Sequence, residues 1–592
     1  MAEADINPLS LQEKLIRYLR TGTEGSFFLP GKNKVFRVFG NVIKVMIEAG
    51  QGPEAVESIK RVNSEKSYYK REPLLYFLAV ATHSSNEPTK KAAYLAVNEV
   101  CENPYDLFMW LKHVKDLSQL TKGWGAGLRK TVTKWYHSRD PMLIAEFVTR
   151  YVSVGRWHHK DVFRLSHMKP ENDSMGFIIK VVCKGLQKAK EEFKNPSEDV
   201  QRLITYFDAV NFIKHSDDSF AVAMKMEEVG LHKEHIPVPL LSSKEIWNSL
   251  LLGMSVKEVI SSLPALARRA FLTIPAEGGG ADKVVEDIQR KVLQKINDSK
   301  AIEDEKISPF FIYIAIRNYV RVFSRQERRE KTHKAGSGVK RELASNTDPT
   351  ELQSAKKKKK KKKKKDKVQN DVEAEEQQQN EEETNVTDKA TKNNPELFES
   401  IHSAFKVAVE KNLPCTGKRY LIAVKASVSE LGKGIRGTPS ISALEVMALM
   451  ATFYKKKEKS ADLGFFTASL THLNFPKEME NIIAEIGQRA APVPNLACDP
   501  AAPITWALEK NRKYDVFLLL SDGTETHGEV KAEDRLKEYR NKMNLPDTKM
   551  ILCGLNAPRL DFAKAPGMLD VGGFDATVPD IINKFITDQL DH

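Results

Sequence analysis

Residues 10–325 consist of many short segments with helical periodicity, and strand-like alternation is almost absent from them. Apolar side chains recur at spacings of three and four in segments such as 72–84, 141–153 and 199–214. Turn sequences such as GQGPE, ENPY and SRDP separate these segments. Helices without a sheet must bury their apolar faces against one another, so the pattern predicts an all-α array of stacked, HEAT-like helical repeats. Such arrays curve into a concave surface or a closed ring.

The sequence changes character at residue 326 and again at residue 395. Between 326 and 394 apolar residues are few, and ten consecutive lysines at 356–365 are followed by an acidic stretch. Because like charges repel and no core can form, we expect a disordered insertion or linker in this region. From 395 to 592 apolar strands such as RYLIAVK alternate with amphipathic helices. This alternation predicts an α/β domain built on a doubly wound parallel sheet.

The net charge of the chain is +13, and the lysine tract at 356–365 supplies ten of the positive charges. The rest of the chain is nearly balanced, at about +3, so a polyanion-binding surface on the folded domains must be a local patch. The tract itself has two interpretations. It is either a nuclear-localisation or nucleic-acid-attracting segment, or a low-complexity insertion without a selected function.

Targeting and redox features favour an intracellular protein. The N-terminus lacks a charged region followed by an apolar run, and no run of about 18 apolar residues occurs, so we expect neither a secretory signal nor a transmembrane helix. The five cysteines are odd in number and widely spaced, without a CxxC pair, which argues against a disulfide framework and a structural zinc site. No Gly-rich phosphate loop, HExxH motif or nucleophile elbow occurs. We therefore expect no enzymatic activity and no cofactor.

The segment GRWHHKDVFRLSHMKP contains the strongest candidates for a binding surface. On a helix, Lys160, Arg164 and His167 fall at i, i+4 and i+7 and share one face. Val162 and Leu165 would point towards a core. Two cations and a titratable imidazole on one face could bind a polyanion. The alternatives are an ordinary solvated helix face and, for His167, a core or capping histidine.

Five separated segments occur in order along the chain: GTEGSFFL (22–29), WGAGLRKTVTKWY (124–136), HKDVFRLSHMKP (159–170), TGKRYLIAV (416–424) and GMLDVGGFD (567–575). Together they resemble the TROVE family, named for telomerase-associated, Ro and vault proteins. The resemblance covers nearly the whole chain except the charged insertion. It implies a helical-repeat ring over 1–325, closed by a von Willebrand factor A-like domain over 395–592. It also implies a non-enzymatic component of ribonucleoproteins.

The RNA ligands are implied by the same resemblance. Y RNAs would bind the outer surface of the ring, and single-stranded 3′ ends of misfolded non-coding RNAs would enter its central cavity, for RNA quality control or storage. The protein would be cytoplasmic with a nuclear pool and would have no membrane partner. RNA-processing proteins would bind the von Willebrand A-like domain. The alternative function is a non-enzymatic protein–protein scaffold, whose binding need not weaken with added salt.

Six basic residues are carried over by motif as an RNA-binding set. They are Lys160, Arg164, His167, Lys169, Arg129 and Lys130. Arginine and lysine neutralise phosphates, and an imidazole can stack on a base or form a hydrogen bond with a 2′-hydroxyl. Trp124 and Trp157 could also stack on bases, although packing in the core is the more common role for each.

Von Willebrand A domains often hold Mg²⁺ through a DxSxS motif after the first strand, because this hard cation prefers oxygen ligands. The corresponding position reads KASVS, with Lys425 in place of the leading aspartate and Ser427 and Ser429 retained. Cys498 stands where a threonine is expected, and Asp522 is retained. An ammonium group at the metal position would repel a dication, so we predict no metal.

Lys425 is instead expected to occupy the space of the metal and to pair with Asp522 or Asp499. Ser427 and Ser429 are then better interpreted as caps of the following helix or turn. Tight binding of Mg²⁺ or Mn²⁺ would contradict this hypothesis.

Overall fold

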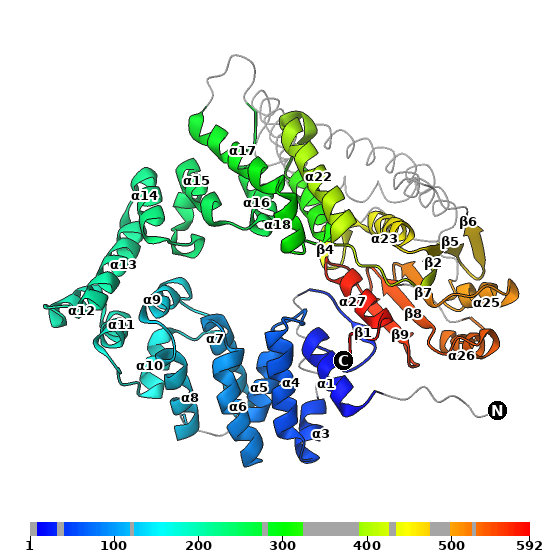
Figure 1. Cartoon of the computed structure of the whole chain (residues 1–592), viewed down its shortest axis with the longest axis horizontal. Coiled ribbons are helices and arrows are strands. Elements are labelled where there is room, and N and C mark those ends of the chain that lie inside the picture. The colour runs from blue at the N-terminus through cyan, green and yellow to red at the C-terminus, as the bar shows by residue number, and fades with distance from the viewer. Residues whose placement is uncertain are drawn as a thin grey trace, which may run out of the picture. The chain divides into compact units, whose positions relative to one another are not determined.

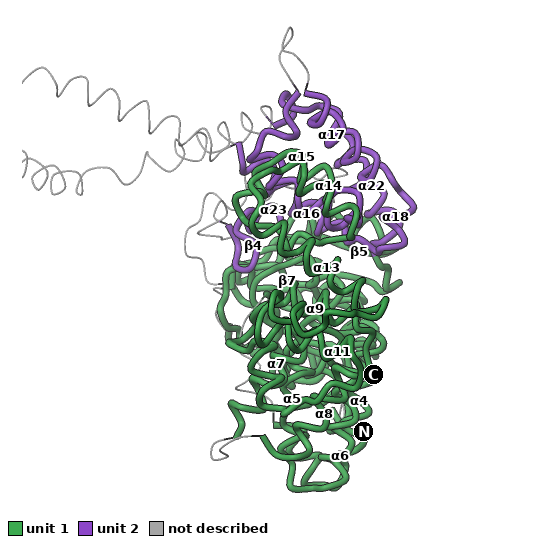
Figure 2. The backbone as a smooth tube through the Cα atoms, turned by 90° about the vertical axis from the view of Figure 1, so that its left-hand side faces the viewer, with its two compact units in different colours: residues 1–250, 414–429, 447–592 green, residues 251–413, 430–446 purple. Residues whose placement is uncertain are grey.

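Figure 1 shows the computed structural model of the chain. It describes residues 9–31, 41–118, 124–274, 282–323, 390–425, 434–473, 498–523 and 528–592. The lysine tract, most of the predicted linker, Ser427 and Ser429 lie outside the described residues. Two compact units are distinguished in Figure 2. The first contains residues 1–250, 414–429 and 447–592, and the second contains residues 251–413 and 430–446.

The first unit begins with a succession of helices. They are α1 (Leu11–Thr21), α3 (Val42–Glu48), α4 (Gly52–Ser64), α5 (Glu72–Thr82), α6 (Glu87–Val100), α7 (Pro104–Leu117), α8 (Ala126–His137), α9 (Pro141–Arg150), α10 (His159–Ser166), α11 (Asp173–Lys184), α12 (Leu186–Glu192), α13 (Glu198–His215) and α14 (Ser219–Val229). Helix α4 packs on α6, α5 on α7, and α6 on α8. Contacts between alternate helices are typical of stacked repeats, so the array predicted from the apolar periodicity is confirmed.

The turn sequences between the helical segments are the N-terminal caps of these helices. Asp140 accepts a hydrogen bond from the backbone N–H of Met142 at 2.8 Å, and α9 starts at Pro141. Asn103 accepts from the N–H of Asp106 at 3.2 Å at the start of α7. Side-chain oxygens at the cap satisfy N–H groups that have no partner within the helix, and proline suits the first turn. The same residues therefore end one segment and begin the next helix.

A seven-stranded sheet forms the α/β part of the first unit. Its strands are β1 (Phe27–Phe28), β2 (Arg419–Lys425), β5 (Ser460–Phe466), β6 (Leu470–Leu473), β7 (Val516–Ser521), β8 (Lys549–Gly554) and β9 (Met568–Gly572), in the order β1-β9-β8-β7-β2-β5-β6. The neighbouring strands are parallel except β5 and β6, which are antiparallel. The predicted parallel sheet is confirmed as a mixed sheet with one antiparallel edge.

Side chains of strand β2 alternate between two cores, as expected for a sheet covered on both faces. Leu421 belongs to a core that includes residues of α25 (Ala502–Glu509) and α26 (Ala532–Met543). The ring of the preceding Tyr420 lies 5.1 Å from that of Tyr454 on α23 (Ala443–Lys457). The Tyr454 hydroxyl donates to Asn583 of α27 (Val578–Ile586) at 3.2 Å. The sheet is therefore doubly wound.

The N-terminal segment joins this sheet, which the sequence did not predict. Phe27 and Phe28 form β1, which pairs with β9 in a parallel register opposite Asp570 and Val571. Nearby, the buried Arg17 guanidinium donates from Nε to the Asp591 carboxylate at 2.6 Å. Helix α1 and the last residues of the chain are thus held together within the first unit.

The second unit is largely helical. It contains α16 (Val256–Arg268), α17 (Lys283–Ile296), α18 (Ser299–Asp304), α22 (Pro395–Lys411) and a hairpin of β3 (Gly434–Ile435) and β4 (Thr438–Ser442). Helix α22, which the sequence assigned to the α/β domain, packs on α17 and α18. The predicted linker is too long by residues 390–394, because Asn394 is buried, caps α22 and donates to the carbonyl of Leu272 at 2.9 Å.

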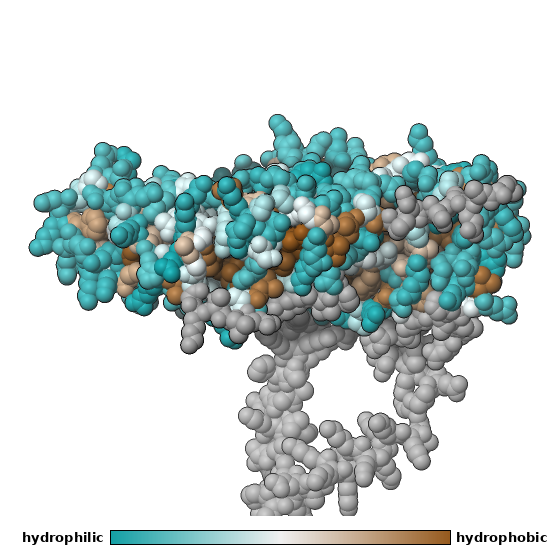
Figure 3. Space-filling model, turned by 90° about the horizontal axis from the view of Figure 1, so that it is seen from below, coloured by the Kyte–Doolittle hydropathy of each residue, from teal (hydrophilic) through white to brown (hydrophobic). Residues whose placement is uncertain are grey.

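No helix among the described residues is long and apolar enough to cross a bilayer. The face shown in Figure 3 is largely hydrophilic.

Candidate nucleic-acid interface

Helix α10 presents Lys160 and Arg164 to solvent. They lie four residues apart, so they share one side of the helix as predicted. The opposite side is buried through His159, Val162, Phe163 and Ser166. The spacing of these four residues, i, i+3, i+4 and i+7, defines the face that packs on the rest of the array.

Leu165 was predicted to face the core, but this is wrong, because its exposed fraction is 39%. The adjacent Phe163 is 3% exposed and takes the core position instead. Its ring lies 4.9 Å from that of Tyr136 on α8. An aromatic contact across the two helices therefore sets the rotation of α10.

His167 is not on the helix, which corrects the predicted i+7 position. The helix ends at Ser166, and His167 adopts a left-handed conformation with φ of 52°. Its backbone N–H donates to the carbonyl of Arg164 at 3.2 Å, and that of Met168 donates to Phe163 at 3.2 Å. These bonds satisfy carbonyls at the helix end. His167 is thus a capping residue through its backbone, while its side chain is exposed.

Four exposed basic residues of this segment have no ion-pair partner among the described residues, unlike His158, which lies 3.3 Å from Asp161. The side chains of Lys160, Arg164, His167 and Lys169 are exposed and make no hydrogen bond or ion pair with the described residues. By contrast, Arg150 and Arg202 on other helices pair with glutamates one turn away, at 3.1 Å and 2.5 Å. We define the four unpaired residues of this segment as the α10 cation cluster.

Helix α10 is anchored by a neutral histidine. His159 is 3% exposed, and burial lowers its pKa to about 3, so the ring is uncharged near neutral pH. The Tyr136 hydroxyl lies 2.8 Å from its Nδ1. The Phe108 ring lies edge-on to it with centroids 4.8 Å apart. No pattern in the sequence separates this core histidine from its exposed neighbours His158 and His167.

The two remaining sequence candidates are on helix α8, which packs against α10. Arg129 and Lys130 are both exposed. Arg129 donates from Nε to the carbonyl of Trp124 at 2.8 Å, so part of its guanidinium is used to hold the start of α8. Lys130 has the greater freedom to contact a ligand.

The tryptophans pack on each other. Trp157 is 8% exposed, and its ring centroid lies 5.7 Å from that of Trp124. Lys115 Nζ lies 5.6 Å from the centre of the Trp157 ring. Core packing is therefore the better interpretation of Trp157.

The structure adds two cations that the sequence analysis missed. A tight turn joins Val154 to Trp157 through reciprocal backbone hydrogen bonds of 3.1 Å and 2.9 Å. Arg156 at its tip has φ of 71° and is exposed. Lys115, which is also exposed, lies beside the same turn through Trp157. Their contribution depends on the turn, which has no periodic signal in the sequence.

The position of the predicted metal site holds an ion pair. Lys425 ends β2 and Asp522 follows β7, and these adjacent parallel strands bring their C-terminal ends together. Lys425 Nζ donates to Asp522 Oδ1 at 2.7 Å, and the side chains are 2% and 4% exposed. Of the two predicted partners, Asp522 is therefore the one that pairs with Lys425.

Two other described residues of this position, Asp499 and Cys498, also lie within the α/β part of the chain. Asp499 accepts a hydrogen bond from the N–H of Ala501 at 2.9 Å, and Cys498 is buried. The described part of the chain contains no group of three or more His, Cys, Asp or Glu side chains arranged to hold a metal ion. A buried ammonium beside the retained carboxylate does not fit a divalent cation, which needs several oxygen ligands.

Comparison with known proteins agrees with both parts of the chain. Residues 52–221 match the family model of the TROVE domain, and residues 419–586 match that of the Ro60 vWA domain. The chain therefore contains a region similar to the TROVE domain and a region similar to the Ro60 vWA domain. This confirms the resemblance inferred from the five sequence segments. The α10 cation cluster lies within the TROVE domain, and the Lys425–Asp522 pair lies within the Ro60 vWA domain.

Two relatives extend over nearly the whole chain. A Caenorhabditis elegans protein named RNA-binding protein RO60 is 24% identical over 98% of this chain and 89% of its own length. A Deinococcus radiodurans protein of the same name is 21% identical over 98% of this chain and 94% of its own length. The crystal structure of Deinococcus radiodurans RO (RSR) protein has a TM-score of 0.74 at 20% identity, and covers 98% of this chain and 100% of its own. The fold of this chain is therefore similar to that of the Deinococcus radiodurans RO (RSR) protein.

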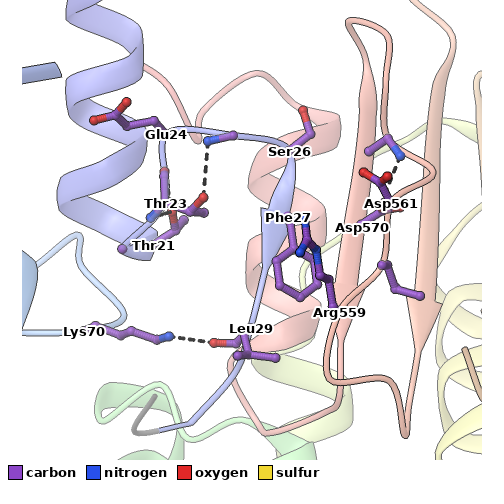
Figure 4. Close-up of a pocket in the computed structure, with 14 residues that line it drawn as sticks. Thr21, Thr23, Glu24, Ser26, Phe27, Leu29, Lys70, Arg559, Asp561 and Asp570 are labelled. Atoms are coloured by element: carbon purple, nitrogen blue, oxygen red, sulfur yellow. Dashed lines mark hydrogen bonds between the residues drawn. The ribbon is translucent and has the colours of Figure 1, made fainter. Parts of the chain in front are cut away.

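The GTEGSFFL segment, which precedes the matched TROVE region, lines a cavity of about 340 Å³ at the edge of the sheet (Figure 4). Lys70 donates to the carbonyl of Leu29 at 2.6 Å, and burial lowers its pKa to about 8. Burial raises the pKa of Asp570 to about 6, and its carboxylate accepts backbone hydrogen bonds from Phe562 and Ala563 at 2.8 Å and 3.0 Å. Basic and acidic groups are mixed here, so this cavity does not favour a polyanion.

Proposed function

We propose that this protein binds small non-coding RNA through the α10 cation cluster and acts without catalysis. One observation carries the proposal: four exposed basic side chains occur on one short segment and are not neutralised by described residues. Phosphates of RNA would supply the missing counter-charges. Relatives named RNA-binding protein RO60 support the same ligand class.

The rigid attachment of α10 supports this assignment. Phosphate contacts give more binding free energy when the cations are already positioned, because less side-chain and backbone entropy is lost on binding. His159, Phe163 and Tyr136 fix the helix from its buried side, and they do so without using the exposed cations. Arg129 and Lys130 on α8 are proposed as additional contacts, with Lys130 the stronger of the two.

The ligand roles follow the resemblance to the TROVE family. We propose that Y RNAs bind the outer surface of the helical array, and that single-stranded 3′ ends of misfolded non-coding RNAs enter a central cavity. The protein would then serve RNA quality control or storage as a ribonucleoprotein component, in the cytoplasm with a nuclear pool. RNA-processing proteins are the proposed partners of the α/β domain, and no membrane partner is proposed.

The experiment is a binding titration with a labelled small RNA that carries a stem and a single-stranded 3′ tail. The variant K160A/R164A/H167A should lose most of its affinity, whereas the control K91A/R61A/H592A, which removes exposed residues of the same types elsewhere, should bind as the wild type does. The logarithm of the wild-type association constant should fall linearly with the logarithm of the salt concentration, with a slope that is smaller in the triple variant. Equal affinity and salt slope in the triple variant and the wild type would overturn the proposal and favour a protein scaffold.

The α/β domain is proposed to work without a bound metal. Lys425 supplies a fixed positive charge where a divalent cation would otherwise lie, so a partner protein would be recognised by surface contacts and not by a bridging ion. Isothermal titration of the full-length protein with Mg²⁺ and Mn²⁺ tests this proposal. Tight binding that disappears in D522N would contradict it.

A further inference from the structure

A cavity of about 330 Å³ lies beside the α10 cation cluster. It is lined by residues of α9 and the segment after it, the start of α10, the end of α11, the start of α12, and α13, all within the first unit. Seven of the residues that line it are apolar. They include Val148, Val152, Val181, Val182, Phe207 and Val210. The size is at the lower end of the range for small-molecule pockets, so it has room for a planar ring system.

The mouth of this cavity is basic. Lys160, a member of the α10 cation cluster, and Lys214 of α13 both line it, together with His158 and Asn211. None of the described residues that line the cavity is acidic. Asp161, which lies outside the lining, is 3.3 Å from His158 Nδ1. The opening is therefore suited to an anionic group attached to an apolar ring.

The depth of the cavity combines aromatic and neutral polar groups. Phe207 is 5% exposed and offers an aromatic side chain. The neutral ring of His159 and the hydroxyl of Thr149 also line the cavity. Val152, which also lines the cavity, is 56% exposed. Unstacked bases in single-stranded RNA are bound by such combinations of aromatic and polar groups.

We propose that this cavity receives one unstacked nucleobase of a single-stranded RNA, while Lys160 and Lys214 hold the flanking phosphates. The inference rests on the proposed function, because it assigns a base to the same surface that binds the RNA backbone. It adds a contact that depends on the base itself, whereas the α10 cation cluster depends on phosphates alone. A lone phosphate or a duplex would not fill the apolar part of the cavity.

The test combines changes in the RNA with changes in the cavity. The probe is an RNA stem with a short 3′ tail in which each tail nucleotide in turn is replaced by an abasic residue. For the wild type, one position should lose about tenfold in affinity, as expected for removal of one stacked base. V182W, which fills the cavity, and V152W, which covers its mouth, should bind the intact RNA about tenfold more weakly and show no further loss with the abasic probe. V238W, which changes a valine that is 80% exposed elsewhere in the first unit, should behave as the wild type.

The outcomes separate this inference from the proposed function. If the wild type binds RNA and K160A/R164A/H167A does not, but no single abasic position matters, the base site is wrong and the phosphate surface stands. If the abasic loss persists in V152W and V182W, the base binds elsewhere and the inference is overturned. Melting temperatures of both variants are measured first, and V152W alone decides the test if V182W does not fold, because Val152 is exposed.

Discussion

The clearest energetic prediction concerns Lys425. Replacing it with methionine keeps a long side chain but removes the ammonium that lies 2.7 Å from Asp522, and both groups are almost fully buried. The remaining carboxylate then lies in the domain interior without its cation. Breaking a buried pair on one side costs about 3–5 kcal/mol. For a domain of this size the loss corresponds to a fall in melting temperature on the order of 10 °C.

Two control variants make this prediction specific. K425M/D522L removes both charges, so it should recover most of the lost stability, since replacing a whole buried pair with apolar groups is often neutral or stabilising. K564M removes a lysine from an exposed pair with Asp561 three residues away. It should cost less than about 1 kcal/mol, because solvent screens such pairs. The same substitution thus tests a buried and an exposed ion pair in one protein.

Differential scanning calorimetry of the full-length protein measures all three variants. The reasoning predicts a large fall in the melting temperature of the α/β domain for K425M and small changes for K425M/D522L and K564M. A melting temperature of K425M within about 1 °C of the wild type would refute it, as the cost estimated for a broken buried pair would then be absent. Equal destabilisation of K425M and K425M/D522L would show that packing of the lysine stem matters and its charge does not.

Three further predictions concern the cap, a buried carboxyl and the turn. H167G should raise the melting temperature slightly, because glycine adopts the left-handed conformation without the cost of about 1 kcal/mol that other residues incur. The same variant should weaken RNA binding. A melting temperature equal to that of the wild type would show that the conformation of His167 carries no such cost. The pKa of Asp570 is raised to about 6 from a usual value of 3.8, so its ionisation between these pH values disfavours the folded state. The wild type should therefore lose about 3 kcal/mol of this contribution between pH 4 and pH 7 relative to D570N, as seen in urea titrations at several pH values. K115A/R156A should weaken RNA binding by a smaller factor than K160A/R164A/H167A in the same titration, since these two cations lie beside the segment and not on it.

Features that depend on repetition could be predicted from the sequence. The helical array follows from an apolar spacing maintained over some 300 residues, and the α/β domain follows from alternating strands and helices. The partner of Lys425 could be narrowed to Asp522 or Asp499, and Asp522 is the one found, because Lys425 ends and Asp522 follows strands that a parallel sheet places side by side. Each of these features is specified either by many residues together or by a rule of sheet topology.

Features that depend on single residues or distant partners could not be predicted. Strand β1 contains only Phe27 and Phe28, too few for any alternation, and its partner β9 lies more than 500 residues away. The end of α10 at His167 has no glycine to mark it, although the left-handed conformation there usually favours one. Leu165 was wrongly predicted to face the core. Helix α10 has only eight residues, so its apolar pattern does not determine which side is buried, and the contact between Phe163 and Tyr136 determines it instead.

The absence of glycine at the end of α10 is itself informative about the candidate site. A histidine in the left-handed conformation is less stable than glycine would be, yet His167 keeps its side chain exposed beside Arg164 and Lys169. The buried side of the helix is packed through His159 and Phe163. The proposed function assigns the exposed imidazole a contact with RNA, and H167G tests this assignment because it removes the imidazole and the cost of the left-handed conformation together. Stability and binding should therefore change in opposite directions in H167G, which distinguishes a ligand-binding histidine from an incidental surface residue.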